Sequence, residues 1–329
     1  SFRSFAEPGP AGRRNDSLRT GPHCSGVDQR RCLVHVSRSL YRLSLFQGVF
    51  MYIKCWGSRG SIPVSGREFQ KYGGDTTCIE IRTRSDDLII VDAGTGIRRL
   101  GNQLIRENRQ VYHFIFTHSH WDHLMGFPFF KPLYEKASRI MMHRCPFPGK
   151  YVETIVTKLM RPPLFPVRYS DLTAQVIYRN GCPDAFEIGS VTVTPISLSH
   201  PNGGCGYKFE EDGKTFVFLT DNELGFVHPG GCRHADYVRF CDGVDLLIHD
   251  AEFSPEEYSR SIEWGHSSCM HTLRMAMEAR VKSLGLFHLN QDRTDDQMDE
   301  LVAGCRRVLS DNASQIDCFG VSRDMTFEL

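Results

Sequence analysis

The sequence contains no long apolar run, no close cysteine pair and no excess of charge of either sign. A helix that crosses a bilayer needs roughly 18 consecutive apolar residues, and no stretch of this chain approaches that length, so a transmembrane helix is excluded. The 12 cysteines are scattered, and the closest two, Cys24 and Cys32, are eight positions apart. This spacing argues against a C-x-x-C metal site and favours the reduced thiols of a cytoplasmic protein.

The balanced charge, 39 basic and 39 acidic side chains, conceals a difference between the first 50 residues and the rest. Residues 1–50 are rich in Arg, Pro, Gly and Ser and show no periodic apolar face, so we expect a disordered or detachable extension. The arginine-rich, acid-poor composition fits an organellar transit peptide. An upstream extension of the reading frame fits equally well, because Met51 opens the ordered pattern. Residues 51–329 are net acidic, which argues against binding to a bulk polyanion.

Residues 51–329 predict a layered α/β architecture, because short apolar strands alternate with amphipathic helices in two successive sets. The expected strands are 51–57, 77–83, 87–94, 114–117, 174–179, 191–198, 205–210, 214–221, 245–250 and 284–289. The expected helices are 97–107, 234–240, 268–281 and 295–309. This order indicates two sheets packed together with helices on the outside.

One short turn crowds ionisable residues in a way that a metal ion explains. The segment "THSHWDHLMG", residues 117–126, contains His118, His120, Asp122 and His123 directly after the apolar run "FIF". We expect a buried strand ending at Thr117 and a short helix with Asp122 as its N-cap. His118 and His120 can then converge on one ion while the other two turn towards a second, with zinc, manganese or iron as the candidates. The plainer reading is a polar loop with incidental histidines.

Four more apolar strands end on a residue that can bind or orient a metal ion. Strand ends on one side of a sheet sandwich collect at one edge, so these residues can meet the 117–126 turn in space. Taken singly, each is also an ordinary turn residue. They are Asp92, His200, Asp221 and His288.

In this order, the motifs "VDAGTG", "THSHWDH", "SLSH", "LTDNE" and "LFH" resemble the five motifs of the metallo-β-lactamase superfamily. The resemblance covers essentially all of residues 51–329 and implies a four-layer αββα sandwich with two divalent metal ions at one edge, zinc foremost. The implied ligands of the first ion are His118, His120 and His200. Those of the second are Asp122, His123 and His288. Asp221 would bridge the two ions, and Asp92 would orient the ligand loop.

Two further stretches, "LIHDAEF" and "EWGHSS", are similar to paired motifs of the tRNase Z-like phosphodiesterase branch. This resemblance implies a diad of Asp250 and His266 beside the metal ions, although that branch more often has Glu at the position of Asp250. It implies a hydroxide between the metal ions as nucleophile, with Asp122, Asp250 and His266 as catalytic residues and His266 as proton donor. Backbone N–H groups at Ser267 would contact phosphate. The alternative is that His266 merely flanks a helix capped by Ser267.

The segment 144–170 carries the residues that we expect to contact substrate phosphate. Its basic side chains stand among prolines and aromatics, although a solvated surface is their commoner fate. They are Arg144, Lys150, Lys158, Arg161 and Arg168.

The chain has no long Gly-Pro-rich arm of the kind that tRNase Z enzymes use to hold the elbow of a tRNA. A cyclic nucleotide or short oligonucleotide is therefore favoured over tRNA as the substrate. The remaining alternatives are a tRNA 3′-end endonuclease, a lactone, thioester or β-lactam hydrolase, a redox protein and a non-catalytic binding protein. A homodimer is compatible with all of them.

Overall fold

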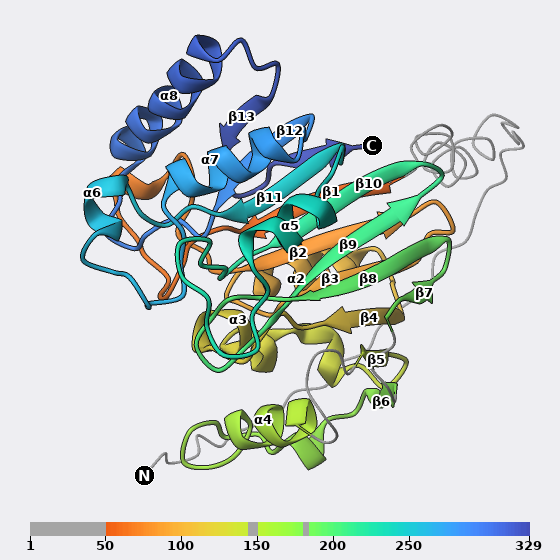
Figure 1. Cartoon of the computed structure of the whole chain (residues 1–329). Coiled ribbons are helices and arrows are strands. Elements are labelled where there is room, and N and C mark those ends of the chain that lie inside the picture. The colour runs from red at the N-terminus through yellow and green to blue at the C-terminus, as the bar shows by residue number, and fades with distance from the viewer. Residues whose placement is uncertain (1–50, 144–150, 180–183) are drawn as a thin grey trace, which may run out of the picture. The chain divides into compact units, whose positions relative to one another are not determined.

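The computed structural model describes residues 51–143, 151–179 and 184–329, which form two seven-stranded sheets with helices between and after the strands (Figure 1). The extension expected at residues 1–50 lies outside the described residues. Among the described helices, none combines the length and the apolar character that a membrane crossing requires.

The first sheet contains strands from the first half of residues 51–329 and closes with the last strand of the chain. Its order is β14-β1-β2-β3-β4-β5-β6. The strands are β1 (Met51–Gly57), β2 (Cys78–Thr83), β3 (Leu88–Val91), β4 (Val111–Ile115), β5 (Arg139–His143), β6 (Gln175–Arg179) and β14 (Thr326–Glu328). Pairing is antiparallel from β14 to β3 and parallel from β3 to β6.

The second sheet repeats this plan, with antiparallel strands on one side and parallel strands on the other. Its order is β13-β12-β11-β10-β9-β8-β7. The strands are β7 (Phe186–Ile188), β8 (Val191–Ser197), β9 (Cys205–Glu211), β10 (Lys214–Leu219), β11 (Leu246–Asp250), β12 (Ser283–Phe287) and β13 (Asp317–Gly320). Strands β10 to β13 are parallel, and β7 to β10 are antiparallel.

Helices connect the strands, and most of the expected ones occur within a few residues of their predicted bounds. They are α2 (Ile97–Arg106), α3 (Trp121–Leu124), α4 (Tyr151–Leu159), α5 (His234–Phe240), α6 (Pro255–Tyr258), α7 (Cys269–Glu278) and α8 (Asp295–Asp311). Four short 3₁₀ turns accompany them: η1 (Arg67–Phe69), η2 (Phe127–Phe129), η3 (Lys131–Tyr134) and η4 (Tyr169–Asp171).

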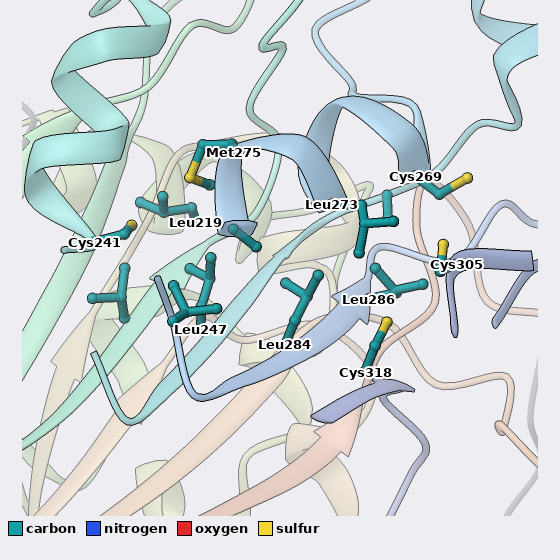
Figure 2. Packing of buried hydrophobic residues seen from close by; sticks show 14 of the residues in the cluster. Leu219, Cys241, Leu247, Cys269, Leu273, Met275, Leu284, Leu286, Cys305 and Cys318 are labelled. Carbon is teal, nitrogen blue, oxygen red and sulfur yellow. The ribbon is translucent and has the colours of Figure 1, made fainter. Parts of the chain in front are cut away.

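Three buried apolar clusters show that the layers are stacked in the order helix, sheet, sheet, helix. One cluster joins the inner faces of both sheets, for example Ile81 with Phe209 and Phe218. A second joins the first sheet to α2 and η2, and a third joins the second sheet to α5, α7 and α8. Figure 2 shows this third cluster, in which leucines of β10, β11 and β12 lie beneath Leu273 and Met275 of α7. The predicted αββα sandwich is therefore confirmed.

Cysteines contribute to this core as small apolar residues. In the described part of the chain, eight cysteines are free, and all but Cys232 are buried. Cys269, Cys305 and Cys318 lie among the apolar side chains of α7, α8 and β13 (Figure 2).

Two local expectations about the metal loop are wrong in detail. Strand β4 ends at Ile115 rather than Thr117, because Thr117 leaves the sheet to bond Asp92 through its N–H and Oγ1. The N-cap of α3 is His120, and Asp122 lies inside the helix. The Asp122 carboxylate does not cap, because it accepts a hydrogen bond from the Ser61 N–H and faces His288 at 3.2 Å.

Candidate metal centre and catalytic pair

The expected site residues follow the carboxyl ends of strands that point to one edge of the sandwich. Asp92 follows β3, the 117–126 turn follows β4, and His200, Asp221 and His288 follow β8, β10 and β12. Strands β8, β10, β11 and β12 all run in the same direction, since β8 and β10 are each antiparallel to β9. The topology therefore collects residues that are up to 196 positions apart, from Asp92 to His288.

Three of these residues leave their strands in the left-handed backbone region. The φ angles are 62° at Asp92, 52° at Asp221 and 56° at His288. This region is strained for residues other than glycine, at a cost on the order of 1–3 kcal/mol each. The surrounding contacts hold the three turns in this conformation, and the result is that each side chain turns from its strand towards the same edge.

The structure brings the seven expected ligands into two groups that share Asp221. In each group, one nitrogen or carboxylate oxygen per residue lies within 4.8 Å of all the others. The first group is His118, His120, His200 and Asp221. The second group is Asp122, His123, Asp221 and His288.

The donor set fits divalent metal ions, and the bonding within the protein leaves room for them. Nε2 of His118 and Nε2 of His123 are buried and have no hydrogen-bond partner among the described residues. Leaving a buried polar atom unpaired is costly in a folded protein, and a metal ion that accepts its lone pair removes that cost. Imidazole and carboxylate donors in this mixture suit divalent transition metals.

Outer hydrogen bonds fix the orientation of three of these imidazoles, as is usual for histidines that bind metal ions. Nδ1 of His123 donates to Asp92 Oδ2 at 2.8 Å, and Nδ1 of His200 donates to the Gly265 carbonyl at 2.9 Å. Each of these bonds occupies Nδ1 and leaves Nε2 facing the other candidate ligands. Burial lowers the pKa of His200 to about 3, so its imidazole is neutral at pH 7, and its Nε2 lies 3.1 Å from Nδ1 of His120 in the same group.

The third of these imidazoles, His288, is held by a residue that the sequence reasoning missed. Its Nδ1 donates to Glu252 Oε2 at 2.9 Å, and the other carboxylate oxygen accepts from Asn290 Nδ2 at 2.9 Å. Glu252 is 4% exposed. Its position two residues after Asp250, in a strand end that already carried one candidate, was the available signal.

Asp250 and His266 form a hydrogen-bonded pair beside the ligand groups. Nδ1 of His266 donates to Asp250 Oδ2 at 2.7 Å, and its ring stacks on the His288 ring at 4.5 Å between centroids. Burial opposes a charged imidazolium, but the carboxylates of Glu252 and Asp250 outweigh it and raise the pKa of His266 to about 9. The side chain of Asp250 is shorter than the Glu that is commoner at this position in the tRNase Z-like branch. It nevertheless reaches His266, because the end of β11 brings the Asp250 backbone close to that ring.

The loop that carries His266 is fastened by Glu223, which the sequence reasoning also missed. This buried carboxylate accepts hydrogen bonds from the N–H groups of Glu263 and Gly265 and from the hydroxyl of Tyr258. The first two bonds are 2.9 and 2.7 Å long. His266 therefore comes from a fixed loop rather than a mobile one.

Arg59 was missed as well, because nothing in "GSRGS" marks it as buried. It is 1% exposed, and its guanidinium donates to the backbone carbonyls of Gly73, Asn290 and Arg293. Burial lowers its pKa to about 10. The arginine ties the loop before Ser61 to the loop after His288, and both loops border the metal ligands.

The expected phosphate contacts are only partly placed. Arg144 and Lys150 lie outside the described residues. Arg161 and Arg168 are exposed on the segment after α4, and in the described structure neither is hydrogen-bonded to a ligand residue. Their role in substrate binding remains a prediction.

The expectation for Ser267 is wrong, because its polar groups are used inside the protein. Ser267 is fully buried, its N–H donates to Asp250 Oδ1, and its hydroxyl donates to the Asn222 carbonyl. The N-cap of α7 is Ser268, whose hydroxyl accepts from the His271 N–H. Neither Ser267 group is available to a phosphate oxygen.

Comparison with known proteins agrees with this geometry. The model of the beta-lactamase superfamily domain matches residues 88–289, more than half of the chain. A Ribonuclease Z of Azobacteroides pseudotrichonymphae is 25% identical over 253 residues, which is 66% of this chain and 83% of that protein.

Two solved structures share the fold at low sequence identity. The metallo-beta-lactamase fold protein YhfI of Bacillus subtilis has a TM-score of 0.63 and 17% identity, covering 85% of this chain and 99% of its own. A diphosphatase from the PhnP family has a TM-score of 0.60 and 17% identity, covering 85% and 98%. With its αββα layers, its clustered histidines and carboxylates at one edge and a family match that spans residues 88–289, the chain belongs to the beta-lactamase superfamily.

Proposed function

We propose that this protein is a phosphodiesterase that binds two divalent metal ions, zinc foremost, and hydrolyses a small phosphodiester such as a cyclic nucleotide or short oligonucleotide. The observation that carries the proposal is the Asp250–His266 pair, which lies against His288 at the edge of the ligand groups. Departure of an alkoxide from phosphorus is assisted by a positioned proton donor, and the resemblance of this pair to the tRNase Z-like branch favours a phosphodiester over a lactone or thioester.

Two metal ions are proposed because the ligand groups share Asp221 and each supplies four donors. His118, His120 and His200 would hold one ion, Asp122, His123 and His288 the other, and Asp221 both. Bound divalent ions lower the pKa of water towards neutrality, which supplies the attacking hydroxide, and they neutralise phosphoryl charge. Asp92 and Glu252 hold the rings of His123 and His288 in place for this purpose.

His266 is proposed to move the proton that the leaving oxygen needs. Asp250 accepts from Nδ1 and so fixes the ring, which leaves Nε2 on the opposite side as the atom that can donate. The bond from Gly265 to Glu223 keeps this ring at the mouth of the site. Charge on a phosphoryl oxygen can be stabilised by the same N–H before the proton is transferred.

The second candidate substrate is the 3′ end of a precursor tRNA. The curated relatives named Ribonuclease Z favour it, and another of them, from Halobacterium salinarum, is 24% identical over 75% of this chain. A small phosphodiester remains the first proposal because residues 51–329 are net acidic and a tRNA body is a large polyanion.

The test is hydrolysis of bis(p-nitrophenyl) phosphate by the metal-loaded full chain, together with His266→Ala. For a substrate with an alkoxide leaving group, such as a cyclic nucleotide, we expect kcat to fall by roughly 10²–10⁴-fold in the variant, the usual contribution of a positioned acid, with an unchanged metal content. The fall for bis(p-nitrophenyl) phosphate should be smaller, because p-nitrophenolate departs without a proton. His234→Ala is the matched control, because His234 pairs with Glu278 on the surface.

Two results would contradict the proposal. Loss of metal from His266→Ala would place His266 among the ligands. No turnover by wild-type protein with two metal ions bound would shift the function to lactones and thioesters. A positive result justifies a comparison of cyclic nucleotides, short oligonucleotides and precursor tRNA as substrates.

A further inference from the structure

Two of the three tryptophans in this chain are exposed, and each lies within two residues of a histidine of the proposed active site. Trp121 is 62% exposed and Trp264 is 64% exposed, whereas Trp56 is 3% exposed and donates its indole N–H to Glu80. Exposing a large aromatic side chain gives up the stabilisation that its burial would provide. Two such residues at one site therefore point to a ligand.

Each of these tryptophans is close in sequence to one of the two histidines of the site that reach the surface. Among the imidazoles of the two ligand groups and the catalytic pair, His120 and His266 are partly exposed and the others are buried. Trp121 directly follows His120, and Trp264 precedes His266 by two residues. The His120 and His266 rings both flank the ring of His200, at 4.8 and 5.3 Å between centroids.

The backbone beneath each tryptophan is fixed. Trp121 opens α3, whose next three residues are all buried. Trp264 donates its N–H to the Ser261 carbonyl and is followed by Gly265, which bonds both Glu223 and His200. Gly265 has φ +92°, and a Cβ there would lie 2.2 Å from the His200 ring, so this approach requires glycine. The backbone that carries each indole is thus held by neighbours of the proposed reacting groups.

We infer that Trp121 and Trp264 form a stacking platform for a nucleobase of the phosphodiester substrate. The inference rests on the proposed function, because the metal groups position the phosphate and the platform then holds the nucleoside that the phosphate carries. An exposed aromatic ring binds a base through its face without reading sequence. The substrate class is therefore a nucleotide diester rather than an alkyl or sugar phosphodiester.

The test uses two esters with the same leaving group. Thymidine 5′-(p-nitrophenyl) phosphate carries a base, whereas methyl p-nitrophenyl phosphate does not. Trp121→Ala and Trp264→Ala should each raise KM for the thymidine ester by about 5- to 100-fold, the usual effect of losing one base stack. KM for the methyl ester should change less than twofold, and Phe at either position should restore most of the loss.

Val111→Ala is the matched control for loss of an exposed apolar side chain. Val111 is 40% exposed and opens β4, so it lies at the end of the strand opposite to the metal loop. It should change neither KM. Metal content is measured in every variant to exclude indirect effects on the neighbouring ligands.

Tryptophan fluorescence provides a readout that does not depend on turnover. Adenosine 5′-monophosphate should quench the metal-loaded protein, ribose 5-phosphate should not, and the quenching should fall when either tryptophan is replaced by Phe. Equal effects of the Ala variants on both esters, or equal quenching by both phosphates, would overturn the platform. A dimer that dissociates in the Ala variants would also overturn the platform, because the two tryptophans would then contact a second copy of the chain.

These outcomes separate the two proposals. If wild-type protein hydrolyses neither ester, the phosphodiesterase proposal fails. Selective quenching by the nucleotide would still support a base-binding platform in that case. If both esters are hydrolysed and the variants do not distinguish them, the phosphodiesterase proposal stands and the platform fails.

Discussion

Replacing Glu252 with Gln tests whether the carboxylate behind His288 controls metal binding. The carboxylate accepts from His288 Nδ1 and from Asn290 Nδ2, each at 2.9 Å, and it lies 3.4 Å from Nδ1 of His266. Although burial alone would raise its pKa, His266 and His288 lower the pKa of Glu252, so the group accepts as a carboxylate. A glutamine has one acceptor oxygen and one donor NH₂ in the same space. It can satisfy His288 only by turning its NH₂ towards the NH₂ of Asn290.

The expected loss of metal affinity follows from this clash between two hydrogen-bond donors. Loss of an outer partner of a metal-binding histidine typically weakens metal affinity by about 10- to 100-fold, equivalent to roughly 1.4–2.7 kcal/mol. We expect Glu252→Gln to lie in this range, and Glu252→Ala at its upper end because Nδ1 of His288 is then left unpaired. The measurement is competition for zinc between the protein and a chromophoric chelator.

Controls separate metal affinity from folding. Glu300→Gln makes the same chemical change on an exposed face of α8 and should leave the affinity unchanged. Thermal unfolding of the metal-free proteins reports any loss of stability that is independent of the metal. A zinc affinity within twofold of wild type in Glu252→Gln would refute the reasoning.

Two further predictions concern stability. Arg59→Met removes the donors for three buried backbone carbonyls, so we expect a loss of about 3 kcal/mol or more and a fall in Tm of roughly 6–12 °C by calorimetry, whereas the exposed Arg274→Met should have little effect. Asp245 accepts hydrogen bonds from Thr215 and Lys282; burial raises its pKa, but these bonds outweigh burial and lower it. Its contribution is thus present above the unfolded pKa near 3.9 and is lost as pH falls through the lower folded value. The Tm deficit of Asp245→Asn should therefore be largest at pH 7 and shrink below about pH 4; a deficit that grows in acid would contradict this account.

The sequence predicted the sheets best where the strands are long and mostly buried. The ranges for β1, β10 and β11 agree to within a few residues, because a run of apolar β-branched and aromatic residues leaves little choice of structure. Strands β5, β7, β13 and β14 were missed. They are short and stand at or near sheet edges, so pairing with a neighbour defines them more than their own residues do.

The candidate ligands were found in the sequence because they follow recognisable strands and crowd one turn. The reach of Asp250 to His266, which seemed too short beside the usual Glu, depends on where β11 ends and was decided by backbone position. The burial of Ser267 was likewise invisible, since a serine before a helix looks the same whether its N–H faces solvent or a carboxylate. The spacing of residues along the chain identifies the candidate ligands, but it does not show which side chains or backbone groups they contact in the fold.

By itself, the sequence determined the αββα class, the seven candidate ligands and the choice of Asp250 and His266 as candidate catalytic residues, because each follows from residue types at short range or from recognisable motifs. Only the tertiary structure decided that Glu252 holds His288, that Arg59 is buried among carbonyls and that Trp121 and Trp264 are exposed. The physical reason is that these features depend on contacts between segments separated by tens to hundreds of residues. Such contacts are set by how the two sheets pack, and the residues involved give no local sign of them.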